Sequence, residues 1–138
     1  MAKNIKGILY SIMTSDEWIM SLVENSDQVY YQNDDADVNR AQSKFDSSIP
    51  LITYHRITDN AAEYPKRRSL FQITSWAKTN LQAEELMNAI VTCFNRRQNM
   101  DGISYVSLNS VDRDTYDKEI KCWGIHLTFT FIYRDLDF

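Results

Sequence analysis

The segment CWGIHLTFTFIY, from Cys122 to Tyr133, alternates between two kinds of side chain. The positions between its large apolar residues hold smaller or more polar ones: Cys122, Gly124, His126, Thr128 and Thr130. The large apolar residues are Trp123, Ile125, Leu127, Phe129, Phe131 and Tyr133. A period of two over this segment predicts a β-strand with one face against a core. We expect the other face of its sheet to meet water or another subunit.

The second strong pattern is helical and covers residues 80–97. Its apolar residues recur on one helix face: Ala83, Leu86, Met87, Ile90, Val91 and Phe94. This stripe predicts a helix packed on the apolar face of the sheet. Thr79 and Gln82 fit a capping box at its start, with Asn80 as a competing cap. The strand-like segment 69–77 leads into it with no Gly or Pro between them.

Weaker patterns complete the expected fold, which is α+β. It has an antiparallel-dominated sheet, the long helix on its apolar face and a short N-terminal helix. Ser15 reads as the N-cap of a second short turn that reaches Val23. The remaining expected elements are a helix at 4–13, strands at 29–32, 49–57 and 103–111, and polar loops at 33–48 and 59–68.

Length and charge restrict the class of protein. The 138 residues fit one domain, 1–138, and the net charge is −4. That charge argues against a nucleic-acid coat or an anionic membrane as partner, because both require clustered Lys and Arg. We expect no signal peptide, because the segment MAKNIKGILY lacks a long apolar core, and the longest apolar run is too short to span a bilayer. Cys93 and Cys122 are expected to be reduced thiols in the cytosol.

The candidate catalytic residues form no recognisable site. His55 and His126 lie on separate expected strands, and no zinc-ligand spacing or Gly-x-Ser-x-Gly motif is present. A Ser-His-Asp site is assembled in space, so the sequence alone leaves it open. No glycine-rich phosphate loop occurs, and we expect no cofactor.

Asp34, Asp35 and Asp37 are the nearest approach to a metal site. They resemble the start of a calcium-binding loop, but Asn39 and Phe45 stand where that loop needs Gly and Glu. We therefore expect a solvated acidic loop and no bound metal.

Two further features suggest contacts with other proteins. Lys66, Arg67 and Arg68 form a short basic group, which we expect at the end of a loop that is solvated or touches another subunit. Trp76 is a large aromatic on the polar side of its strand, shared with Gln72 and Thr74. It either fills a sheet edge or anchors an interface.

Three segments together resemble the small tail-completion (tail terminator, head–tail joining) proteins of long-tailed bacteriophages. They are SIPLITYHRI, with a Pro before an apolar strand, FQITSWAKTNLQAEELMNAIVTCF, with a Trp-containing turn into the central helix, and GIHLTFTFIYRD, with a Gly before alternating aromatics. The resemblance covers most of residues 45–135.

The resemblance implies a non-enzymatic virion protein without a cofactor, assembled in the host cytoplasm. Proteins of that family form a ring, usually sixfold, at the head-proximal end of the tail tube, where they stop tube growth and meet the head connector. The implied partners are copies of the chain itself, the tail tube protein and the connector protein. DNA would pass through the ring without specific binding.

We expect the acidic and basic groups to lie on loops that contact neighbouring subunits or the tube. The first group is Asp34, Asp35 and Asp37, the second is Lys66, Arg67 and Arg68, and Trp76 is a further candidate contact.

Two alternatives remain open. One is another neck component, a head-closure or adaptor protein. The other is a small metal-dependent hydrolase or nuclease that uses the three aspartates and a histidine.

Overall fold

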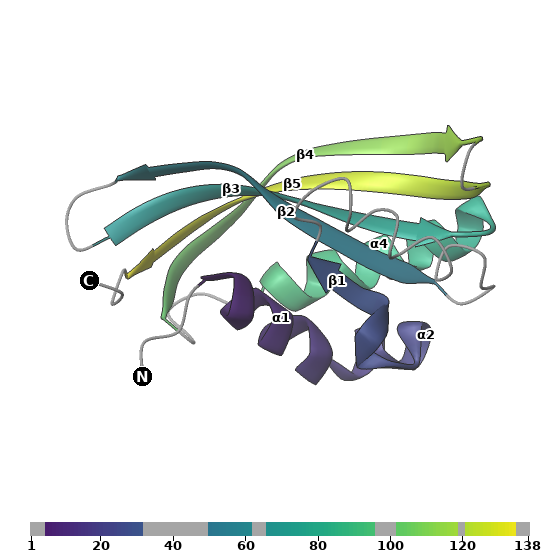
Figure 1. Cartoon of the computed structure of the whole chain (residues 1–138), viewed down its shortest axis with the longest axis horizontal. Helices are drawn as coiled ribbons and strands as arrows, with labels where there is room; N and C mark the ends of the chain where they lie inside the picture. Colours follow the sequence, from purple (N-terminus) through teal and green to yellow (C-terminus); the bar gives the residue numbers. More distant parts are fainter. Residues whose placement is uncertain (1–4, 32–49, 62–65, 96–101, 119–120, 135–138) are drawn as a thin grey trace.

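The computed structural model describes residues 5–31, 50–61, 66–95, 102–118 and 121–134, and Figure 1 shows its elements in chain order. The helical elements are α1 (Ile5–Ser15), α2 (Glu17–Val23), the 3-10 turn η1 (Ser26–Gln28) and α4 (Asn80–Asn95). The strands are β1 (Val29–Tyr31), β2 (Leu51–Ala61), β3 (Lys66–Ala77), β4 (Ile103–Asp117) and β5 (Cys122–Arg134).

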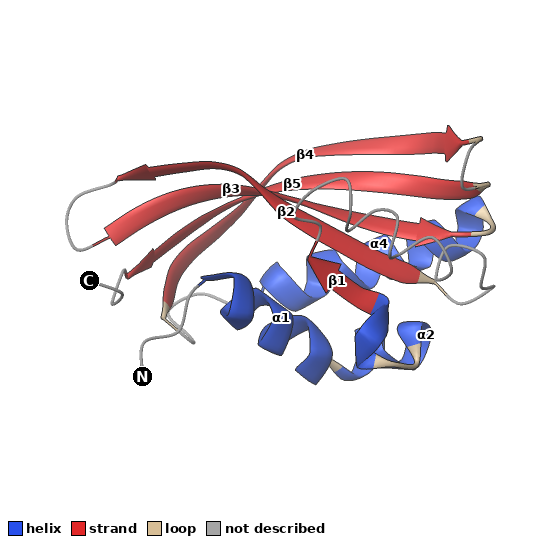
Figure 2. Ribbon diagram, viewed as in Figure 1, coloured by secondary structure: helices blue, strands red, loops and turns tan. Residues whose placement is uncertain are grey.

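The strands form one sheet in the order β1-β2-β3-β5-β4. β1 runs parallel to β2, and the β2–β3, β3–β5 and β5–β4 pairs are antiparallel. The predicted α+β class with an antiparallel-dominated sheet is confirmed. The helices lie on one side of this sheet (Figure 2).

The core lies between α4 and the apolar face of the sheet. Phe94 on α4 packs against Phe129 and Phe131 of β5, with ring centroids 5.4 Å from each. Met87 and Ile90 are buried on the same helix face, as its spacing predicts. Burying one such side chain stabilises the fold by about 1.5–3 kcal/mol, so this face provides much of the attachment of α4.

The passage from β3 into α4 is held by side-chain hydrogen bonds. The Ser75 hydroxyl donates to the Ala83 carbonyl over 3.0 Å, inside the core. The backbone N–H of Gln82 donates to Thr79 Oγ1 over 3.2 Å, which confirms Thr79 as the N-cap. The Ala83 amide in turn donates to the Thr79 carbonyl, 3.1 Å away. These bonds fix the helix immediately after the strand.

The cap of α2 corrects one prediction. Asp16, not Ser15, is the N-cap, and its carboxylate accepts a hydrogen bond from the Ile19 amide at 2.9 Å. Ser15 is instead the last residue of α1, while Asp16 has the extended backbone of a cap, with φ −82° and ψ 123°. α1 thus continues two residues beyond the predicted end, and α2 starts directly after it.

The strands are longer than predicted, and the loop predicted at 59–68 is wrong at its two ends, because residues 59–61 belong to β2 and residues 66–68 belong to β3. β2 continues to Ala61 and β3 begins at Lys66, with Ala61 paired to Arg67. β4 likewise runs on to Asp117 instead of ending at 111. Both extensions are polar in sequence, and strand pairing satisfies their backbone groups.

Several predictions fall outside the described residues. The polar loop at 33–48 and the last two residues of the predicted helix, Arg96 and Arg97, are among them. Within the described part, no helix is both long and apolar enough to cross a membrane.

Candidate functional site on the open face of the sheet

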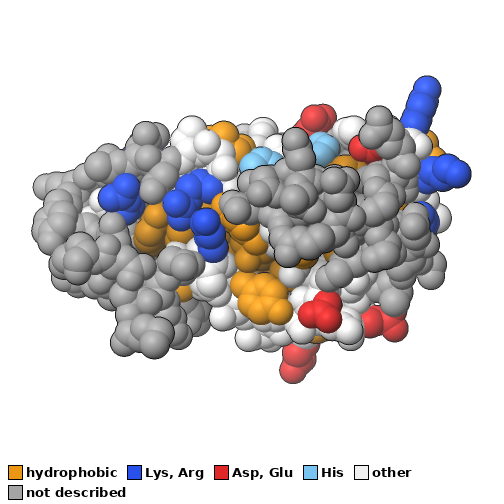
Figure 3. Space-filling model, in the orientation of Figure 1, with side chains coloured by type: hydrophobic (Ala, Val, Ile, Leu, Met, Phe, Trp, Pro, Cys, Tyr) orange, Lys and Arg blue, Asp and Glu red, His pale blue; other side chains and the backbone are white. Residues whose placement is uncertain are grey.

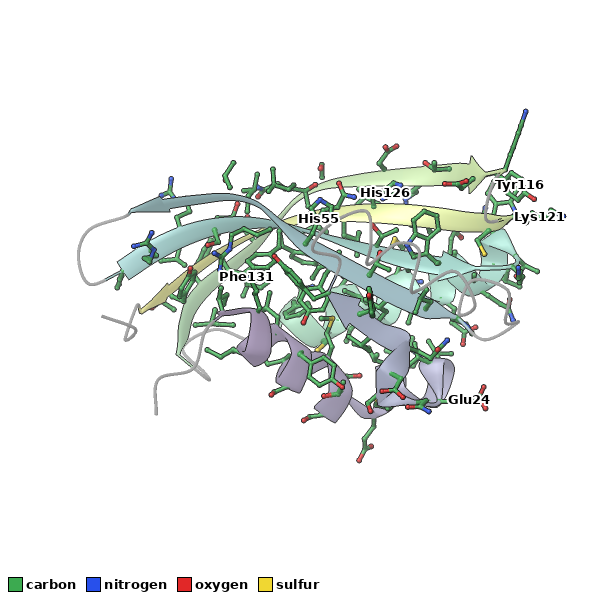
Figure 4. All side chains as sticks on the ribbon, in the orientation of Figure 1. Glu24, His55, Tyr116, Lys121, His126 and Phe131 are labelled. Carbon is green, nitrogen blue, oxygen red and sulfur yellow. The ribbon has the colours of Figure 1, made fainter. Side chains whose placement is uncertain are left out.

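The face of the sheet that points away from α4 carries two rows of polar side chains, which we call the open face. Register places Thr53, Thr74, His126 and Asp112 side by side across β2, β3, β5 and β4. The neighbouring row is His55, Gln72, Thr128 and Ser110. Figure 4 shows His55 and His126 on this side of the sheet, whereas Phe131 points toward the helices.

His126 is held by hydrogen bonds from the adjacent strand. Its Nδ1 lies 2.9 Å from Thr74 Oγ1 and 3.2 Å from Gln72 Nε2. An amide NH₂ can only donate, so Nδ1 accepts, and the proton of the neutral ring sits on Nε2. The same Gln72 amide also donates to Thr74 Oγ1 over 3.4 Å.

Both imidazoles are biased toward the neutral form. Burial lowers the pKa of His55 below its usual value, and the nearby His126 lowers it further. Burial also lowers the pKa of His126, while the carboxylate of Asp112 partly opposes this. Desolvation disfavours the charged ring, so the middle of the open face carries no cationic histidine at neutral pH.

The Thr74 hydroxyl and the His126 imidazole resemble part of a nucleophile–base arrangement, but the hydroxyl is closed to a substrate. Thr74 is only 2% exposed, in the middle of an interior strand, so its oxygen cannot reach a substrate carbonyl. Among the described residues, no group of three His, Cys, Asp or Glu side chains could hold a metal ion. The geometry suits a rigid polar surface better than a reaction centre.

Trp76 lies on the open face, as its alternation predicts. Its Nε1–H donates to Thr53 Oγ1 over 2.8 Å, and its ring stands edge-on to His126 at a centroid distance of 5.6 Å. It also packs with Leu51 and Cys122 in a small second cluster. The sheet-edge alternative for Trp76 is wrong, because β3 has neighbours on both sides. Its role as an interface anchor stays a prediction.

The basic group lies at the far end of β3 instead of in a loop. Lys66 and Arg68 are exposed and pair with β5 positions of the open face, whereas Arg67 faces the other way and is half-buried. The predicted acidic partners Asp34, Asp35 and Asp37 lie outside the described residues. The structure therefore brings no acidic and basic site residues together within its described part.

Sequence reasoning missed the partners of His126. It placed Gln72 and Thr74 on the face of Trp76, but it gave no register between β3 and β5, which are about fifty residues apart in the chain. Asp112 was missed because the predicted strand ended one residue earlier, at 111. Residues 112–117 read DRDTYD and show no apolar alternation, so the sequence held no strand signal there.

Comparison with known proteins gives a structural match. No protein-family model matches the sequence, and a search of curated proteins gives no match. A solved chain from a structure described as "Virion of native gene transfer agent (GTA) particle" shares the fold with a TM-score of 0.61. The match covers 95% of this chain and 95% of that one, at 12% sequence identity. At this identity the likeness concerns the fold alone.

Proposed function

We propose that this chain is a structural protein of a phage-like virion. The observation that carries the proposal is the match to a chain of a gene transfer agent virion, because it spans 95% of both chains. The open face agrees with this role. Its middle presents hydrogen-bonded polar side chains and a half-buried Trp76, a composition found at protein interfaces.

Within the virion, we propose the role of a tail terminator. The chain would form a ring at the head-proximal end of the tail tube, end tube growth and meet the head connector. Three segments of sequence resemble tail-completion proteins, and they correspond to β2, to β3 with α4, and to β5. The proposal includes no catalysis, and its partners are further copies of the chain, the tube protein and the connector. DNA would pass through the ring without specific contacts.

The test is tube capping in a purified system. Tubes assembled from the tube protein of the same particle are incubated with this chain and viewed by electron microscopy, and native mass spectrometry counts the copies in the ring. We expect one ring at one tube end and no further elongation. Binding to isolated connector but not to tubes would assign the chain to another part of the neck. A metal-stimulated nuclease activity lost with Asp35→Ala would replace the structural role with an enzymatic one.

A further inference from the structure

One end of the molecule is acidic and carries an exposed aromatic side chain. Residues 16–28 contain four acidic residues and no Lys or Arg. Glu17, Glu24 and Asp27 are exposed, whereas Asp16 caps α2. Trp18 lies among them with 42% of its surface exposed, which is unusual for a tryptophan. We call α2 and η1 with these side chains the acidic end.

The opposite end is basic and also carries an exposed apolar residue. The paired ends of β2 and β3, residues 57–61 and 66–69, form what we call the basic arm. Lys66 and Arg68 are exposed on it. Ile57 lies where the β2–β3 register shifts, and it is 45% exposed. Each end therefore combines charge with an exposed apolar group, as protein interfaces do.

The two ends cannot meet within one chain. β1 follows η1 directly and pairs with the start of β2, Val29 opposite Ile52, whereas the basic arm lies at the other end of β2. At about 3.3 Å per residue, the nine steps from Ile52 to Ala61 place the ends about 30 Å apart. That exceeds the Debye length of about 8 Å at physiological salt several-fold, so the charges do not neutralise each other.

The figures agree with this separation. Figure 1 places the β2–β3 ends and α2 on opposite sides of the molecule. In the face drawn in Figure 3, Lys and Arg side chains lie over the end of the sheet with the basic arm, and further ones protrude at the opposite end of the sheet. Asp and Glu side chains lie along the helical edge near α2 in the same view.

We propose that the basic arm of one copy docks on the acidic end of the next copy, head to tail. This inference rests on the proposed ring and names the surfaces that build it. Every copy carries one surface of each kind, so each contact leaves a free arm and a free acidic end, and the chain of contacts ends only when it closes into a ring. Lys66 and Arg68 face the carboxylates of the neighbour, and Trp18 provides the aromatic centre of the contact.

The experiment exchanges the charges of the two surfaces separately. One variant carries Lys66→Glu and Arg68→Glu, and the other carries Glu17→Lys and Glu24→Lys. Asp16 is left unchanged because it caps α2. All four side chains are exposed, so both variants should keep the wild-type helix content and melting temperature. A control variant, Glu85→Lys with Lys118→Glu, changes exposed charges outside both surfaces.

Self-association is measured by native mass spectrometry and sedimentation, with tubes present if the free chain is a monomer. We expect each variant alone to associate at least about tenfold more weakly than wild type, because like charges then face each other across the contact. An equal mixture of the two should associate again, since each arm then meets an acidic end of opposite charge. Raising the salt should weaken the wild type and strengthen each single variant. Trp18→Ala should weaken association without changing its salt dependence.

Two results overturn the contact. The first is association of both variants at the wild-type level, and the second is a mixture that associates no better than its parts. In either case rings of wild-type chain that cap tubes would leave the proposed function intact. A wild-type chain that neither self-associates nor binds tubes would remove the terminator role itself.

Discussion

The indole ring of Trp76 lies directly on the α-carbon of Gly124, its partner on the neighbouring strand. A Cβ added at Gly124 would stand 2.6 Å from Cζ3 of that ring, closer than non-bonded carbon atoms approach. The same ring donates its N–H to Thr53. Gly124 therefore lets an aromatic side chain bridge β5, β3 and β2 on the open face.

Gly124→Ala should destabilise the fold by about 1–3 kcal/mol, because the ring must move and its hydrogen bond to Thr53 stretches. Chemical denaturation followed by tryptophan fluorescence measures the loss. In a Trp76→Ala background the same change should cost nothing or stabilise slightly, since Ala suits a strand better than Gly. Equal losses in both backgrounds would show that the ring is not what excludes a side chain.

Ile90→Asp should unfold the protein or cost several kcal/mol of unfolding free energy. Ile90 is fully buried between α4 and the sheet, and a carboxylate there has no partner to offset its desolvation. Asn88→Asp is the matched control, because Asn88 is exposed two positions earlier on the same helix. The melting temperatures of both variants, followed by circular dichroism, test this prediction. A soluble Ile90→Asp protein with an unchanged melting temperature contradicts the packing of α4.

Asp16→Ala should lower the free energy of unfolding by about 1 kcal/mol, the usual contribution of an N-cap. The lost interaction is the hydrogen bond from the Ile19 amide. Ser15→Ala tests the other assignment at the neighbouring position and should change stability little, because Ser15 is exposed at the end of α1. If urea denaturation showed a larger loss of stability for Ser15→Ala than for Asp16→Ala, Ser15 would be the N-cap of α2.

Stability should fall as the pH drops from about 7.5 to about 5.5. The folded pKa values of His55 and His126 lie below the ordinary 6.5. The unfolded chain therefore binds more protons than the folded one between the lowered values and 6.5. The histidines' contribution is complete above pH 6.5 and is lost as the pH falls through that window. Melting temperatures across the range measure the slope.

A variant with His55→Gln and His126→Gln should show a smaller change over the same pH range. The side-chain oxygen introduced by His126→Gln can accept a hydrogen bond from the Thr74 hydroxyl, and it thereby replaces the imidazole nitrogen as acceptor. An unchanged slope would assign the pH dependence to other groups.

The fold was predictable where one side chain pattern repeats over a long segment. β5 and α4 follow their periodicities, and Thr79 was found from its position before the helix. The polar ends of β2 and β4 were not predictable, because their residues show no apolar alternation and their strand character comes from pairing with neighbours. Tertiary context, not local preference, extends these strands.

The open face was predictable in outline but not in detail. The alternation in β3 and β5 placed Trp76 and His126 on it, yet the bond between His126 and Thr74 depends on register. The basic group was predicted in a loop because Lys66, Arg67 and Arg68 carry no strand pattern of their own. Their strand conformation comes from pairing with β2 and β5.

The strand order has a consequence for how the protein is made. β5 lies between β3 and β4, although it follows both of them in the chain. While the ribosome is still synthesising β4, the sheet lacks the strand that joins its two halves, and the apolar faces of β3 and α4 stay open. A nascent chain stalled before Cys122 should therefore be recognised by chaperones and cut readily by proteases. Release of β5 supplies the strand that joins β3 to β4 and should complete the sheet.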